Sequence, residues 1–169
     1  MRMTRRLTTM ALTTLALTTL GPAALASGGN PHWVSGSGAV TNAGNLVVNF
    51  KSAGLGANQG ITITASANAQ AIYACKNHGG NFPQDPKKQE VTGTVSKSDN
   101  FSSEKSGNVT GSLTLAPPPS TSALACRDDQ IPVLAKVTYS QVQVSSPPLG
   151  NLPISGTYSK VLEPNCKCL

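Results

Sequence analysis

The chain of 169 residues is predicted to be all-β, with a single antiparallel β-sandwich of about seven or eight strands that is immunoglobulin-like in size. Three observations lead to this fold class. Apolar and polar residues alternate with a period of two over Ile61–Cys75, turn-forming residues recur at short spacing, and no segment shows a convincing helical period. Because each strand of a sandwich buries one face, the fold requires an alternating pattern of this kind.

The segment Ile61–Cys75 is the longest regular pattern in the chain. Every odd position is apolar, whereas the even positions begin with threonine. An alanine-rich helix over Ala65–Ala74 is the competing interpretation, since alanine is the best helix former, but a helical period explains the start of the segment poorly. Fifteen extended residues span roughly 50 Å, more than a small sandwich is usually tall, so we expect the strand to bend or break at the alanines of 65–71.

Six shorter segments are expected to supply the remaining strands. The segment 133–144 changes phase at Ser140-Gln141, where we expect a bulge that re-aims the strand. A polar loop is expected at 97–107, and Pro117-Pro118-Pro119 forces an extended connection without backbone donors. The expected strands are 33–40, 46–51, 91–96, 109–115, 133–144 and 154–162.

The N-terminal residues predict export. Three arginines precede a mildly apolar run that a Gly-Pro pair breaks, and Ala24-Leu25-Ala26 supplies the small residues of a signal-peptidase site. The run is too short and too rich in threonine for a membrane span, which needs about 20 predominantly apolar residues. We therefore expect residues 1–26 to be a signal peptide for the general secretory route, rather than the twin-arginine route, and residues 27–169 to be one secreted domain.

The charge of the chain does not indicate a nucleic-acid partner. The whole chain has 13 basic and 7 acidic residues, a net charge of +6, and removal of the three leader arginines leaves 10 minus 7, or +3. Nucleic-acid binding is typical of a clustered basic face with stacking aromatics. The lysines are scattered, and only Lys87-Lys88 are adjacent. They are therefore expected to lie on a solvated surface.

Four cysteines in an exported chain predict two disulfides, since thiols oxidise outside the cytosol. A bridge within Cys166-Lys167-Cys168 would close a very small ring, because disulfide geometry limits the separation of the two α-carbons. Geometry alone therefore favours pairing Cys75 and Cys126 with the two tail cysteines. The rival pattern is Cys75–Cys126, with the tail pair bridged to each other or left reactive.

The chain offers few residues for catalysis. Cys75 and His78 are spaced as a nucleophile with its base, or as half of a zinc site with the tail cysteines, but both uses require free thiols. Asp128-Asp129 is the only acidic pair, and neighbours on an extended chain point to opposite faces. No catalytic motif, metal or cofactor is expected. A hydrolase or thiol-active enzyme using Cys75 and His78 remains an alternative, as does a small protease inhibitor presenting the loop 117–125.

The surface residues indicate recognition rather than chemistry. Threonine-rich faces could bind ice or glycans, although the chain is poor in aromatic residues and an ordinary polar sheet surface is the simpler interpretation. Trp33, Phe82 and Phe101 remain for a small contact patch. We expect contact at the long, glycine-rich loop 76–88. Its tentative binding residues are Asn77, His78, Asn81 and Phe82; the threonines are Thr62, Thr64, Thr92, Thr94, Thr110 and Thr114.

Most of the predicted secreted domain resembles a group of exported small β proteins of unknown function, found mainly in bacteria. The element that carries most of the resemblance is Cys75-Lys76-Asn77-His78-Gly79-Gly80-Asn81. The resemblance implies Cys75–Cys126 as the regular disulfide and no assigned catalytic residues. Export, disulfides, polar sheet faces and the absence of a catalytic set lead us to expect an extracellular recognition or surface-matrix role with an unknown ligand. The other matching residues are 46–50, 54–56, 58–59, Pro83, Lys88, 111–115, Cys126 and 137–140.

Overall fold

The computed structural model describes residues 29–169. The predicted signal peptide, residues 1–26, lies outside this range. The described chain is built from strands, and it contains no helix long and apolar enough to cross a membrane. The prediction of an all-β protein is confirmed, and the alternative helix over 65–74 is wrong. The strands are β1 His32–Val40, β2 Leu46–Ala53, β3 Gly60–Asn77, β4 Lys88–Ser102, β5 Val109–Leu115, β6 Gln130–Ser146, β7 Gly150–Ile154 and β8 Tyr158–Val161.

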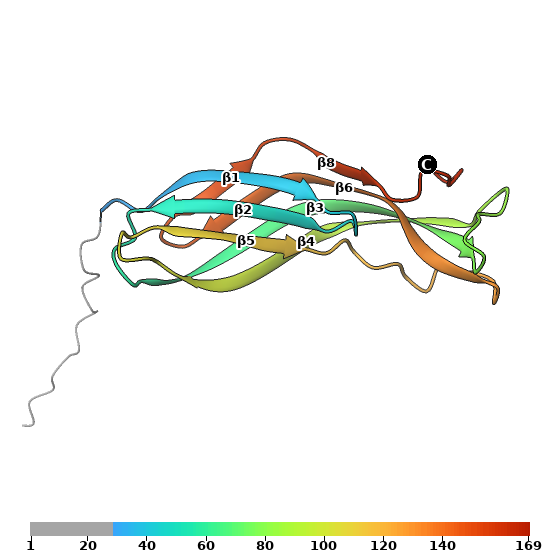
Figure 1. Ribbon diagram of the computed structural model, residues 1–169, viewed down its shortest axis with the longest axis horizontal. Helices are drawn as coiled ribbons and strands as arrows, with labels where there is room; N and C mark the ends of the chain where they lie inside the picture. The colour runs from blue at the N-terminus through green and yellow to red at the C-terminus, as the bar shows by residue number, and fades with distance from the viewer. Residues whose placement is uncertain (1–28) are drawn as a thin grey trace, which may run out of the picture.

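The strands form two antiparallel sheets that pack face to face (Figure 1). The first, sheet A, has three strands in the order β1-β2-β5. The second, sheet B, has the order β4-β3-β6, and both β7 and β8 pair with the far side of β6. The connections β2–β3, β4–β5 and β5–β6 each cross from one sheet to the other. This arrangement confirms the predicted sandwich.

The main hydrophobic core lies between sheet A and one half of sheet B. Leu46 and Val48 of β2 are fully buried in the same core as Ile63 and Ala65 of β3, and the two β3 residues follow the predicted alternation. At the centre of the core, the hydroxyl of Tyr139 donates a hydrogen bond of 2.8 Å to the Gly44 carbonyl. The other buried members of this core are Phe50, Leu55, Ile61, Ala67, Ala69, Val109, Leu113, Leu115, Val137, Val142, Val144 and Ile154.

The long strand β3 runs for 18 residues without a break. Its bending is accommodated by irregularities in its neighbour β6. Gln141 and Val142 lie together opposite Ala67, and Gln141 has a φ of +50°. The predicted bulge is therefore confirmed, and a second register shift follows at Ile72. Bulges increase local twist, which allows a strand of this length to stay paired on both sides.

Sheet B extends beyond sheet A (Figure 1). We call this extension, with its loops, the distal half; the part in which the two sheets face each other is the sandwich half. The distal half has its own small cluster, in which Ala74 and Ala135 pack against Cys166 and Cys168, with Phe82 beside them. It comprises residues 72–77, 88–91 and 130–135 of the sheet, the loops 78–87 and 116–129, and the tail 162–169.

Two chain segments cover the two faces of the distal sheet. On the face that continues the core side, the Tyr73 hydroxyl donates to the Pro118 carbonyl at 2.8 Å, and Leu124 is buried. On the opposite face, Cys166 and Cys168 of the tail pack against Ala74 and Ala135. The segment 116–126 therefore takes the place of sheet A on the core side, whereas the tail covers the outer face, which is exposed in the sandwich half.

Two boundaries differ from the sequence predictions. The loop expected at 97–107 is wrong over its first part, because β4 continues to Ser102 and pairs with residues 60–64 of β3. The last expected strand, 154–162, is divided into β7 and β8.

Strand β4 is an edge strand of sheet B, and Lys97 and Asp99 lie on its core-side face because they pair with Ala65 and Ile63.

Candidate functional site

Both disulfides lie in the distal half, one on each face of the sheet. Cys75 bonds to Cys126, as the resemblance implied, and Cys166 bonds to Cys168. The geometric pairing of Cys75 and Cys126 with the tail is therefore wrong. Its physical reason is the alternation of β3: Cys75 points to the face that residues 116–126 cross, whereas the tail packs on the opposite face, against Ala74. The α-carbons of the tail pair are 5.1 Å apart, within the usual range for a disulfide.

The predicted binding residues at the end of β3 have structural partners. Asn77 ends the strand, and its side-chain oxygen accepts a hydrogen bond of 3.0 Å from Gln130. The backbone of Asn77 also closes the turn, by bonding to Asn81 and Gly80. His78 is exposed, and its backbone nitrogen donates to the Asp129 carbonyl at 3.1 Å. Asn77 and His78 therefore shape the turn, and they do not line the hollow formed by the other two predicted residues.

The other two predicted residues, Asn81 and Phe82, line a hollow of about 440 Å³ between the loop 78–87 and the tail. We call it the tip hollow. Lys76 and Glu163 form an ion pair across it, with Nζ to carboxylate distances of 2.7 and 2.9 Å. The Lys76 ammonium also lies 5.3 Å from the centre of the Phe82 ring. The remaining lining residues are Gly80, Pro83, Gln84, Asn165 and Lys167.

The tail residues of the tip hollow were missed by sequence reasoning. Lys76 and Glu163 are separated by 87 positions in the chain. The tail reaches the hollow because Leu162 and Glu163 bond to β6 and because Cys166 and Cys168 pack on the distal sheet. No local sequence pattern predicts such a contact. The signal available in the sequence was the pair of tail cysteines, because disulfides were expected to involve them.

The tip hollow provides binding groups rather than a reaction centre. Its amides, ammonium groups and carboxylate can form hydrogen bonds and ion pairs, and Phe82 adds an aromatic surface. Cys75 is fully buried in its disulfide and cannot act as a thiolate nucleophile. Within residues 29–169, no three His, Cys, Asp or Glu side chains come close enough to hold a metal ion.

The three aromatic residues expected to form one patch lie in two places. Trp33 and Phe101 both pack edge-on against Phe50 of the sandwich core, with ring centres 6.1 and 5.1 Å apart. Phe82 belongs to the tip, in the distal half. All three rings are half-buried; Phe82 lines a hollow of the distal half, whereas Trp33 and Phe101 belong to the sandwich half.

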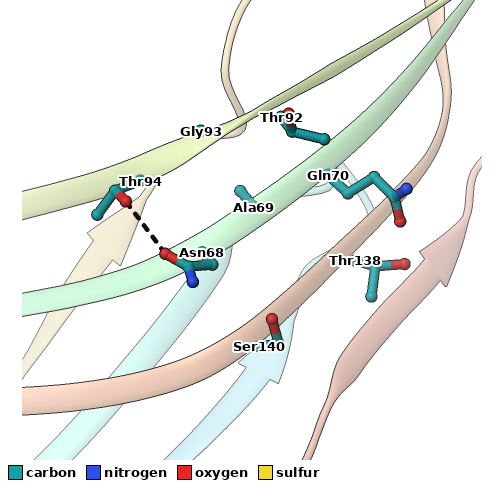
Figure 2. Close-up of a pocket in the computed structure, with 8 residues that line it drawn as sticks. All are labelled: Asn68, Ala69, Gln70, Thr92, Gly93, Thr94, Thr138 and Ser140. Atoms are coloured by element: carbon teal, nitrogen blue, oxygen red, sulfur yellow. Dashed lines mark hydrogen bonds between the residues drawn. The ribbon is translucent and has the colours of Figure 1, made fainter.

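A second hollow lies on the outer face of sheet B, the face turned away from sheet A (Figure 2). Its volume is about 340 Å³. The register places its polar side chains in two rows across three strands: Thr94, Asn68 and Ser140 form one row, and Thr92, Gln70 and Thr138 form the other. The floor is the backbone of Ala69 and Gly93. The sequence predicted the threonine-rich face, but the rows depend on the register.

The tyrosines with perturbed titration are structural. Burial raises the pKa of Tyr73, and burial raises the pKa of Tyr139 to about 12. Perturbed groups often mark functional sites, but both phenols face the covered side of sheet B and donate to backbone carbonyls. Their raised pKa values therefore result from packing between the sheet and its covering layers and do not mark a functional site.

Comparison of the chain with protein-family models, with curated proteins and with solved structures finds no match. The assignment of a site consequently depends on the geometry of the two hollows, and the resemblance to exported β proteins stays a prediction.

Proposed function

We propose that this protein is a secreted, non-catalytic recognition protein that contacts a partner outside the cell through its tip. The observation that carries the proposal is the tip hollow, which two separate chain segments build and a disulfide on each face of the sheet supports. The two disulfides and the predicted signal peptide support a location outside the cytosol. The partner is an extracellular ligand or surface.

The construction of the tip suits recognition because it holds loops on a fixed base. Binding residues commonly lie on loops that a rigid scaffold positions. Here the loop 78–87 is held by the backbone bond from Cys75 to Lys87, and the tail by Lys88, whose ammonium donates to the Cys168 carbonyl. Segments that are already ordered lose less entropy on binding, which favours affinity.

The alternative functions have less support. An enzyme using Cys75 and His78 needs a thiolate, and the Cys75 sulfur is oxidised and buried. A protease inhibitor needs a rigid, accessible loop; the segment 117–125 is attached to the sheet through Pro118 and Leu124 and exposes Thr121, Ser122 and Ala123, but it does not line the tip hollow. The oxidised Cys75 argues against the enzyme, and the tip hollow favours recognition there over inhibition through this segment.

The proposal is tested by binding of the purified, disulfide-intact protein to cell-wall fragments, extracellular proteins and whole cells. The variant Asn81→Trp fills the tip hollow, and Lys105→Trp places the same side chain in an exposed loop of the sandwich half. We expect a loss of at least about tenfold in affinity for Asn81→Trp and none for Lys105→Trp. Equal binding of both variants would remove the tip from the proposal, and no binding to any of the three materials would contradict the recognition role itself.

A further inference from the structure

We infer that the outer face of sheet B carries a second binding site, for a neutral polyhydroxylated ligand such as an oligosaccharide. The site is the hollow of Figure 2, which we call the sheet hollow. It shares no residue with the tip hollow, so it goes beyond recognition at the tip. The inference depends on four features: the grid of polar side chains, their fixed positions, their remaining hydrogen-bonding capacity and the lack of charge.

The grid arises from the pairing of three strands. Thr94–Asn68–Ser140 and Thr92–Gln70–Thr138 are directly opposed residues, so all six side chains rise from the same face. Neighbouring strands lie about 4.8 Å apart and the two rows roughly 6.6 Å apart along the strands, which is the scale of a sugar ring. Ala69 and Gly93 place no side chain on this face. The space between the rows therefore stays open (Figure 2).

Hydrogen bonds between side chains hold this grid in place. Asn68 is fixed from two sides, because its amide nitrogen donates to Gln141 and its oxygen accepts from Thr94 at 3.0 Å. The amide nitrogen of Gln70 donates to Glu90 at 2.6 Å, and the Thr138 hydroxyl pairs with Ser159 at 3.1 Å. Side chains that are already ordered in the free protein reduce the entropy lost on binding.

The outer face of sheet A provides an internal comparison. It also has a polar hollow, of about 410 Å³, around Ser37, Asn49 and Ser112. Within residues 29–169, these three side chains make no hydrogen bond to another side chain. A polar sheet surface alone therefore does not produce the ordered grid seen on sheet B, and the site is assigned to sheet B for this reason.

The grid retains donors and acceptors for a ligand. An amide side chain has two donors and an acceptor oxygen with two lone pairs, so Asn68 keeps one of each, and Gln70 keeps one N–H and its whole oxygen. The hydroxyls of Thr92 and Ser140 make no hydrogen bond within the described range of the chain. Groups that both donate and accept match the hydroxyls of a sugar, which do the same.

Because the polar residues that line the sheet hollow carry no charge, the hollow favours a neutral ligand. All six polar lining residues are uncharged. The first charged residues on this face, Glu90 and Lys136, lie on either side of Ile72, beyond the second row, and the Glu90 carboxylate accepts from Gln70. Binding should consequently depend little on salt, since screening acts on interactions between charges.

The test uses NMR titration of the disulfide-intact protein with linear oligosaccharides of glucose, mannose, galactose and N-acetylglucosamine, at low and at high salt. We expect at least one of them to shift the amides of residues 68–70, 92–94 and 138–140, with equal affinity at both salt concentrations. Ser140→Trp should lower this affinity at least about tenfold by filling the hollow. Gln143→Trp is the matched control, because Gln143 lies on the same strand and face but outside the hollow.

A milder pair of variants guards against misfolding of the tryptophan variants. Thr92→Val removes one free hydroxyl and should weaken binding by about two- to tenfold, whereas Thr114→Val on sheet A should leave it unchanged. The inference is overturned if no oligosaccharide shifts these amides, if Ser140→Trp and Gln143→Trp bind alike, or if the affinity falls strongly at high salt. Shifts confined to 76–84 and 163–167 would place sugar binding at the tip instead, which overturns the sheet hollow and leaves the proposed function standing.

Discussion

The sandwich half and the distal half contain the same two long strands, but different layers cover these strands in each half. In the sandwich half, β3 and β6 lie under sheet A, and the contact is made by large apolar side chains such as Leu46 and Ile63. In the distal half, the same strands carry the segment 116–126 on one face and the tail on the other, and apart from Leu124 the buried residues are small alanines and cystines.

This difference shows how a sheet can extend beyond its core. Alanines bury too little apolar area to hold a covering segment by the hydrophobic effect alone. The chain entropy of the covering segments is limited by disulfides instead, one on each face. The distal half should therefore loosen locally when its bridges are removed, whereas the sandwich half should fail only when its core is disturbed.

The largest expected effect is the removal of the Cys75–Cys126 bridge by the double substitution Cys75→Ala and Cys126→Ala. The bridge joins residues 51 positions apart, for which loop-closure entropy predicts a loss of about 4 kcal/mol in the free energy of unfolding. Hydrogen exchange should accelerate most at residues 72–77 and 130–135. The matched control is Cys166→Ser with Cys168→Ser, which opens a far smaller ring and should lose roughly 1 to 2 kcal/mol.

The second effect is expected in the sandwich core. Leu46→Ala leaves a cavity beneath sheet A and should lower the free energy of unfolding by about 3 kcal/mol, measured by urea unfolding. Because β3 and β6 continue into the distal half, exchange should accelerate in both halves at once. Acceleration confined to β1, β2 and β5 would contradict the view that the distal half depends on the sandwich.

The smallest effect concerns Tyr139, whose phenol lies fully buried between the sheets. Tyr139→Phe removes its hydrogen bond to Gly44 and should lower the free energy of unfolding by about 1 kcal/mol at neutral pH. The substitution should also change the response to alkali. In the native protein, burial raises the pKa of Tyr139 from 10.0 to about 12, so the folded state keeps a proton that the unfolded chain loses near pH 10.

The stabilisation associated with this proton is therefore complete below pH 10 and is lost as the pH rises towards 12. We expect urea unfolding on both sides of pH 10 to show that the free energy of unfolding falls less with rising pH for Tyr139→Phe than for the native protein. Tyr158→Phe, at a phenol that donates to the Ser155 carbonyl on the surface, is the control. If the free energy of unfolding changed with pH in parallel for the native protein and Tyr139→Phe, a raised pKa of a buried Tyr139 would be excluded.

The fold class could be predicted because the alternation of apolar and polar residues indicates which face of each strand is buried. The inward residues Ile61 and Ile63 and the bulge at Ser140-Gln141 were visible for this reason. The end of β4 could not be predicted. Residues 98–102 are polar except for Phe101, because one side of the strand is exposed and its edge is open, and only their pairing with residues 60–64 makes them a strand.

The candidate sites were predictable to a smaller extent, because they depend on long-range placement. Asn81 and Phe82 were identified from a loop, but Glu163 and Lys167 reach the same hollow through the folding of the tail. Geometry favoured the wrong disulfide pairing for the same reason, since the pairing follows from which face of the sheet each segment covers, whereas the resemblance implied the bridge Cys75–Cys126 that the structure shows. The grid on sheet B required the register of three strands, which the alternation alone does not specify.

The open edge of β4 has a consequence for self-association. A fifteen-residue strand with unpaired backbone groups is a template for addition of a strand from another molecule, which is the route to fibres and precipitates. Lys97 and Asp99 point towards the core side of this edge. An added strand would enclose both charges next to apolar neighbours, and the resulting loss of hydration opposes such growth. These two charges therefore oppose strand addition at the outer edge of β4, with which no other strand of residues 29–169 pairs.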